Sequence, residues 1–122
     1  MVVLSRLCFA VLLASASAVG APALAGRGAA GIDIVNATNT TITGLFIRRT
    51  GTAIWAPLPA TPARPLKGAH AASAFADPDC AFDIKATLDP NTVAVWTGVN
   101  LCEVKSVTLN RNAAGVTWAD YD

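Results

Sequence analysis

The chain has 122 residues, and its 9 Lys and Arg against 8 Asp and Glu give a formal net charge of +1. This balance excludes the strongly basic surface that nucleic-acid and anionic-membrane partners require. The length is that of one small domain.

Residues 1–25 have the three parts of a secretory signal peptide. A positively charged start precedes an apolar run over 7–19, and Ala23-Leu24-Ala25 ends the segment with small residues at the two positions that a signal peptidase reads. The run is shorter than the roughly 20 residues of a membrane-spanning helix. We therefore predict a cleaved signal peptide rather than a membrane anchor.

Cleavage is expected between Ala25 and Gly26, which leaves residues 26–122 as a single exported domain in the periplasm or outside the cell. Arg6 would be removed with the leader, so the remaining domain would have eight basic and eight acidic residues. A neutral domain of this kind predicts neither a nucleic-acid partner nor membrane insertion after cleavage.

The cysteines point to one disulfide. Removal of Cys8 with the leader leaves Cys80 and Cys102. An even number in an exported protein favours a disulfide over two buried free thiols.

The rest of the chain is typical of about seven short strands separated by turns every 8–12 residues, with no convincing helix. In residues 80–88, for example, apolar side chains alternate with Asp83, Lys85 and Thr87. This spacing predicts an all-β fold, a small antiparallel β-sandwich. The expected strands are 32–35, 41–49, 70–76, 80–88, 92–97, 103–110 and 116–121, and the expected turns are 36–39, 50–52, 77–79, 89–91 and 110–115.

Residues 56–68 interrupt this pattern with Pro57, Pro59, Pro62 and Pro65. Proline lacks the N–H that a central strand donates, so the segment is either a loop or a cover for a sheet edge. Because it is stiff and follows a tryptophan, we predict a ligand-contact surface made of Trp55, Pro57, Leu58 and Pro59.

Several segments in order resemble a family of small exported bacterial proteins of uncharacterised function. The matching pieces are Ile34-Val35-Asn36 with Thr38, Ile42-Thr43-Gly44-Leu45-Phe46, Trp55 with the Pro/Leu segment after it, Cys80-Ala81-Phe82-Asp83-Ile84, and Val99-Asn100-Leu101-Cys102. The resemblance implies a compact β domain in which Cys80 and Cys102 are joined. It implies no activity, and Ala-Pro-Leu-Pro after Trp55 departs from the glycine and acidic stretch expected there.

Catalytic and metal-binding groups are scarce. His70 is the single histidine, and Ser73, three residues away, would face the other side of a strand. One histidine cannot supply a zinc or copper site. Asp77, Asp79 and Asp83 could in principle hold calcium, but a turn capped by aspartates is favoured. We predict no catalytic residues, no metal and no cofactor.

The tryptophans could form an aromatic platform for a sugar, so a carbohydrate-binding site is a minor alternative. Trp96 and Trp118 lie in strand patterns and are expected in the core, whereas Trp55 is the best candidate for a partly exposed contact residue. Arg48 and Arg49 are interpreted as an ordinary solvated strand end.

These observations predict a non-enzymatic exported β domain that binds a protein or another envelope component, or supports an envelope assembly. The alternative is a secreted hydrolase inhibitor that presents the rigid proline-rich loop. A carbohydrate-binding module and a hydrolase with an unrecognised site are further alternatives.

Overall fold

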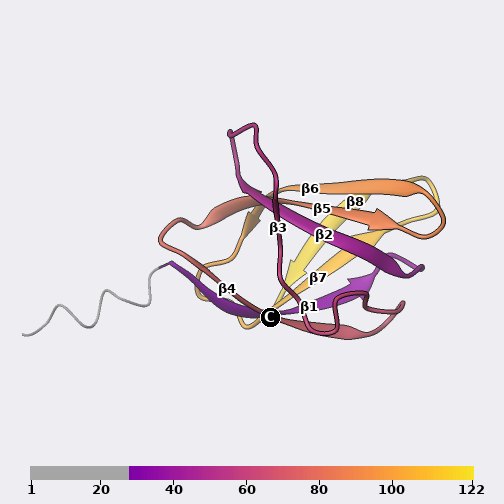
Figure 1. Cartoon of the computed structure of the whole chain (residues 1–122), viewed down its shortest axis with the longest axis horizontal. Helices are drawn as coiled ribbons and strands as arrows, with labels where there is room; N and C mark the ends of the chain where they lie inside the picture. Colours follow the sequence, from indigo (N-terminus) through magenta and orange to yellow (C-terminus); the bar gives the residue numbers. More distant parts are fainter. Residues whose placement is uncertain (1–27) are drawn as a thin grey trace, which may run out of the picture.

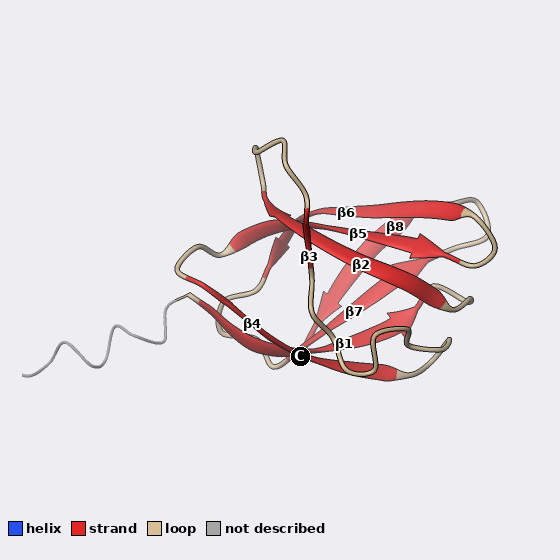
Figure 2. Ribbon diagram, in the orientation of Figure 1, coloured by secondary structure: helices blue, strands red, loops and turns tan. Residues whose placement is uncertain are grey.

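The computed structural model describes residues 28–122, so the predicted signal peptide, its cleavage site and Cys8 lie outside the described residues. Within that range the chain forms eight strands and no helix (Figures 1 and 2). The strands are β1 (Ala29–Ala37), β2 (Ile42–Arg49), β3 (Ala56–Pro57), β4 (His70–Asp77), β5 (Ala81–Leu88), β6 (Thr92–Asn100), β7 (Ser106–Arg111) and β8 (Thr117–Tyr121). None of the residues described here forms a helix that could cross a membrane.

The strands form two four-stranded sheets, in the orders β4-β1-β7-β8 and β3-β2-β5-β6. The all-β sandwich predicted from the sequence is thus confirmed. One pairing departs from the antiparallel expectation, because β1 and β7 run parallel. These two strands are far apart in the sequence, and the chain crosses to the second sheet and back twice before β7 reaches β1.

The core lies between the sheets and is built by the alternation of apolar residues along each strand. Ile34 and Val107 from one sheet and Ile84 from the other are fully buried. Trp96 is also buried, as predicted, and its Nε1 donates to the Asn110 carbonyl oxygen at 2.9 Å.

The prediction that Trp118 is a core residue is wrong. Its exposed fraction is 45%. Trp118 lies on β8, an edge strand, and it is the next residue, Ala119, that packs against the core. A single alternating pattern cannot tell which face of an edge strand is covered.

The proline-rich segment joins the two sheets along one side. Its first residues form β3, which pairs with β2, and the Leu58 N–H donates to the Leu45 carbonyl oxygen at 2.9 Å. Thr61 then pairs with Ala72 of β4 through two hydrogen bonds of 2.9 Å. We call residues 58–65 the strap. The edge-covering interpretation of the prolines is confirmed, since the strap spans from one sheet to the other.

The disulfide between Cys80 and Cys102 is present. Cys80 immediately precedes β5, and Cys102 lies in the connection from β6 to β7. The bond therefore ties the second sheet to the segment that leads back into the first.

Asn36 fastens the strap to the turn that follows β1. It is fully buried, and its Nδ2 donates to the carbonyl oxygens of Thr40 (2.7 Å) and Pro65 (2.9 Å). Its Oδ1 accepts from the N–H and the hydroxyl of Thr38 at 3.0 and 2.6 Å. The sequence pattern placed a turn over 36–39, but Asn36 belongs to β1 and its side chain, rather than its backbone, organises the turn.

Replacing Asn36 with Ala is expected to lower the free energy of unfolding by about 2 kcal/mol, because buried polar groups lose their partners. Urea denaturation followed by circular dichroism would measure the change. Asn91→Ala, at an exposed turn position, is the matched control. Equal stability of the two variants would show that the Asn36 network contributes nothing.

Candidate functional site

The most prominent feature of the surface is the loop that connects β2 to β3, residues 50–55. In Figure 1 it projects from the sandwich at the top of the view. Residues 51–54 are exposed, and Ile54 has an exposed fraction of 84%, more than the other exposed large apolar residues of the described chain. Single exposed apolar residues are common on protein surfaces. Whether Ile54 can act as a contact residue therefore depends on how rigidly the rest of the protein holds its loop.

The loop is supported at its base by Asp83, which is 3% exposed although it lies on the outer side of β5. One carboxylate oxygen accepts from the Thr50 hydroxyl at 2.8 Å and from the Gly98 N–H at 3.0 Å. The other accepts from Arg48 Nε at 2.9 Å. A buried carboxylate with three donors is well satisfied and holds Thr50, the first residue of the loop, in place.

The register of the sheet brings these groups together. Arg48 and Asp83 are directly opposite each other on β2 and β5. On the other side of β5, an extra residue in β6 opposite Asp83 forms a bulge, and Gly98 adopts a φ of 64°. This left-handed conformation favours glycine and allows the N–H to point at the carboxylate.

The charge of Asp83 is favoured by these partners. Burial by itself raises the pKa of Asp83, but the Gly98 N–H, the Thr50 hydroxyl and the Arg48 guanidinium together outweigh it, and the pKa lies below the ordinary value. Asp83 is therefore an ionised structural anchor, not a carboxyl group held ready to donate a proton.

Further hydrogen bonds restrict the loop just beyond its base. The Thr50 N–H donates to the Ala81 carbonyl oxygen at 3.1 Å. The N–H and the hydroxyl of Thr52 both donate to the Arg49 carbonyl oxygen, at 3.0 and 2.6 Å. The first half of the loop thus forms a closed turn.

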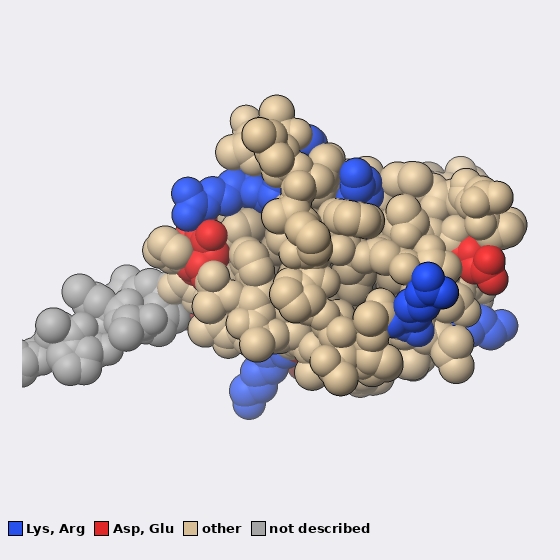
Figure 3. All heavy atoms as spheres, viewed as in Figure 1, with Lys and Arg blue, Asp and Glu red and all other residues tan. Residues whose placement is uncertain are grey.

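Trp55 ends the loop within a set of residues that we call the basic–aromatic cluster: Phe46, Arg48, Trp55 and Lys85. Arg48 Cζ lies 4.2 Å from the centroid of the Trp55 ring, and Lys85 Nζ lies 4.8 Å from it. Lys85 Nζ is also 5.0 Å from the Phe46 ring centroid. Cations at these distances are attracted to the rings and are held in place by them. Figure 3 shows Lys and Arg side chains on both sides of the base of the projecting loop.

The residues predicted to contact a ligand are not all at the surface. Trp55 is half-buried, and Pro57 and Pro59 are exposed. Leu58 is 4% exposed and packs in the core, so it is a structural residue rather than a surface contact. The strap, which begins at Leu58, lies against the sandwich, whereas the loop before Trp55 projects from it.

Sequence reasoning missed Arg48, Asp83 and Lys85 as members of a site. Arg48 is not an ordinary solvated strand end, because it pairs with a buried carboxylate and lies against Trp55. The alternation in 80–88 did place Asp83 and Lys85 on one face. No sequence signal showed that the tryptophan and Arg48 would cover that face.

The aspartates before β5 form the capped turn that the sequence favoured. Asp77 Oδ1 accepts from the Asp79 N–H at 2.8 Å, and Asp79 Oδ1 accepts from the Cys80 N–H at 3.0 Å. The Asp79 N–H, with Arg49 adding to its effect, holds the pKa of Asp77 below its ordinary value. In residues 28–122 no group of three or more His, Cys, Asp or Glu residues is arranged to hold a metal ion.

His70 and Ser73 lie as expected for opposite faces of a strand. His70 is exposed, and its Nδ1 is hydrogen-bonded to an Asp33 carboxylate oxygen on the neighbouring strand β1. Ser73 is buried, and its hydroxyl accepts from the Phe75 N–H at 3.2 Å. The two side chains do not form a nucleophile–base pair.

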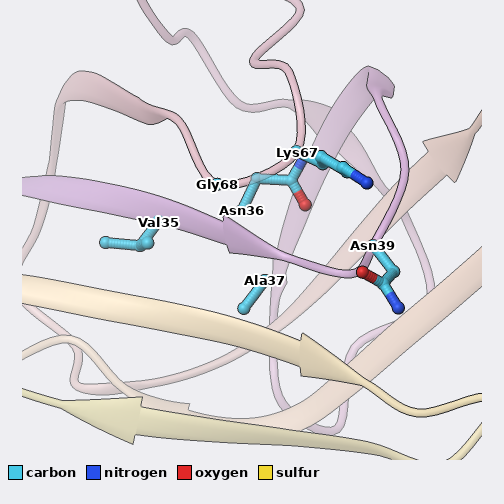
Figure 4. Close-up of a pocket in the computed structure, with 6 residues that line it drawn as sticks. All are labelled: Val35, Asn36, Ala37, Asn39, Lys67 and Gly68. Carbon is cyan, nitrogen blue, oxygen red and sulfur yellow. The ribbon is translucent and has the colours of Figure 1, made fainter.

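Two hollows on the described surface have side chains that could contact a ligand. A depression of about 370 Å³ lies beside the end of β1, with Lys67 and Asn39 along one side of it (Figure 4). Asn36 also lines it, but the four side-chain hydrogen bonds described above already engage its amide. A crevice of about 130 Å³ lies between β6 and β8 and is lined in part by Trp118 and Tyr121. Neither hollow brings together charged groups, as the basic–aromatic cluster does.

No protein-family model matches the chain, and no curated protein or solved structure is detectably similar to it. The resemblance to small exported bacterial proteins therefore stays a prediction, and the function is argued from the loop and the cluster.

Proposed function

We propose that this protein is an exported, non-enzymatic binding domain that docks a protein partner through the loop 50–55. The observation that carries the proposal is the 84% exposure of Ile54 on a projecting loop whose base is fixed by the buried Asp83. Insertion of an apolar side chain into a partner's pocket is the kind of contact that dominates protein interfaces.

The bracing of the loop supports this role. A segment that is already held in one conformation loses less conformational entropy when it binds. Thr50 is held by Asp83, Thr52 is bonded back to Arg49, and Trp55 lies against Arg48. Ile54 is thus presented from a loop that is restrained on both sides.

The export part of the proposal is supported by the Cys80–Cys102 disulfide, which indicates an oxidising environment, and by the signal-peptide pattern of residues 1–25. Sequencing the N-terminus of the protein recovered from its natural host tests this part. A first residue at Gly26 is expected, and an intact chain that begins at Met1 with reduced cysteines would contradict it.

The docking surface is tested by placing a photoreactive residue at position 54 or, as the matched control, at Leu66. Leu66 is also an exposed apolar residue, at 65%, but it lies after the strap. Irradiation in the natural host should give a discrete protein adduct from position 54 and not from position 66. The purified Ile54→Asp variant should then bind the identified partner at least about tenfold more weakly than the wild type, as expected for loss of an interface hot spot. Identical adducts from both positions would contradict the proposal.

A hydrolase inhibitor is the second candidate, and the projecting braced loop favours it specifically. The inhibitory segment would be residues 50–55, not the proline-rich segment, which is tied down as the strap. Incubation of micromolar protein with a panel of proteases tests this candidate. Inhibition that Ile54→Asp abolishes would establish it, and a panel without inhibition would leave docking to a non-catalytic partner.

A further inference from the structure

The basic–aromatic cluster carries more accessible positive charge than negative. Its cations are Arg48 and Lys85. The carboxylate beside them, Asp83, is buried, with an exposed fraction of 3%. The Asp83 carboxylate accepts a hydrogen bond from Arg48 Nε, so its negative charge is paired within the protein. In the part of the chain that the structure describes, Lys85 forms no ion pair with a carboxylate.

Both cations are held in position before any ligand arrives. Arg48 is fixed by Asp83 at Nε and by Trp55 against its guanidinium, and no bond within residues 28–122 uses its two terminal nitrogens. Lys85 Nζ lies between 4.8 and 5.0 Å from the centroids of two aromatic rings. Two preorganised cations on one face form a site for an anionic group, because little side-chain entropy remains to be lost.

The position of the cluster in the sheet restricts the kind of ligand. β2 lies between β3 and β5, and β5 lies between β2 and β6, so both are interior strands. Beneath the cluster the backbone is paired on both sides, since Phe46 and Ile47 pair with β3 and β5, and Lys85 pairs with β2 and β6. The cluster therefore offers its cationic and aromatic side chains. An extended peptide gains much of its affinity from free backbone groups at a sheet edge, which this face lacks.

We propose that the basic–aromatic cluster binds a carboxylate-bearing saccharide. The sugar carboxylate would accept hydrogen bonds from Lys85 Nζ and the terminal nitrogens of Arg48, and the apolar face of the sugar ring would pack beside Trp55 and Phe46. This site is separate from the docking of a protein through Ile54. Together the two surfaces would let the domain join an acidic glycan to a protein.

Isothermal titration of the purified full-length protein with tetragalacturonate tests the site. Binding is expected to be absent for the neutral galactose tetrasaccharide and to weaken as NaCl is raised, because an exposed ionic contact is screened. Lys85→Gln should raise the Kd about tenfold, as expected for loss of one charge-assisted hydrogen bond. Lys105→Gln, at an exposed position away from the cluster, should leave the Kd unchanged.

Three results would overturn the saccharide site. Equal Kd values for Lys85→Gln and Lys105→Gln would show a non-specific charge effect, and no binding at millimolar ligand would remove the site. Tighter binding of a tetraglutamate peptide would show that the cluster recognises an acidic peptide instead. Ile54→Asp should leave saccharide binding intact, so failure here and failure of the docking proposal are distinguishable. Unchanged thermal unfolding of Lys85→Gln would show that the fold is retained.

Discussion

Replacing Asp83 with Ala is expected to lower the free energy of unfolding by about 3 kcal/mol, near the lower end for breaking a buried charged network. The variant leaves the Gly98 N–H and the Thr50 hydroxyl without their acceptor and removes the ionic partner of Arg48. Arg48 is partly exposed, so water can replace part of what it loses. Urea denaturation would measure the loss, with Asp89→Ala at an exposed turn as the matched control. Equal stability of the two variants would show that Asp83 is not an anchor.

The same substitution should weaken partner binding through the loop 50–55 even at temperatures where the variant stays folded. Without Asp83, Thr50 loses its side-chain anchor, so binding would have to order the start of the loop. Thr50→Val tests this effect with less damage to the fold, because it removes one hydroxyl only. Hydrogen exchange at residues 50–55 should become faster in both variants. Unchanged exchange would show that other contacts brace the loop.

The contribution of Asp83 should depend on pH in a defined direction. Because its pKa in the folded protein lies below the ordinary value of 3.8, the charged form is stabilised by folding. The stabilisation is fully present above the unfolded pKa and is lost as the pH falls through the lower folded pKa. The stability difference between the wild type and Asp83→Asn should therefore be constant from neutral pH down to about pH 5 and shrink below it. A difference that grows on acidification would contradict the assignment of an ionised anchor.

Replacing both Cys80 and Cys102 with Ser is expected to lower the free energy of unfolding by roughly 3 kcal/mol. The disulfide closes a loop with a sequence separation of 22, and its main effect is to limit the conformations of the unfolded chain. For a small domain whose total stability is about 5–10 kcal/mol, this is a large share. Urea denaturation of the oxidised wild type and the double variant would measure it.

Reduction provides the control for the disulfide. Dithiothreitol should lower the stability of the wild type to near that of the double serine variant and leave the variant unchanged. The mass of the wild type should rise by two hydrogen atoms on reduction, because dithiothreitol supplies two electrons and two protons to the bond. Two thiols that react with an alkylating agent without reductant, or a wild type insensitive to reduction, would contradict the bond.

The surroundings of Asp83 could be predicted from the sequence only in part. Alternation along residues 80–88 placed Asp83 and Lys85 on the face opposite the core residues, and the strand β5 confirms it. That pattern could not show that Asp83 would be buried. Its burial requires Arg48 opposite it on β2 and the bulge at Gly98 on β6, and both depend on the register between strands.

The two connections around Trp55 show the same limit. Four prolines correctly predicted an irregular, edge-covering segment, because a residue without an N–H cannot sit in a central strand. The sequence suggested that this segment presents the contact surface. In the structure Leu58 packs in the core and Thr61 pairs with β4, so this segment lies along the sandwich. The connection that projects from the sandwich is the loop 50–55.

The amino-acid sequence by itself determined the strand content, the pairing of Cys80 with Cys102 and the burial of Trp96. These properties follow from local periodicity and from the small number of cysteines, and both can be read from a single sequence. The parallel pairing of β1 with β7, the exposure of Trp118 and the assembly of Arg48, Asp83, Lys85 and Trp55 were decided by the tertiary structure. They depend on which strands become neighbours and in what register, and those contacts join residues far apart in the chain that carry no local signal for each other.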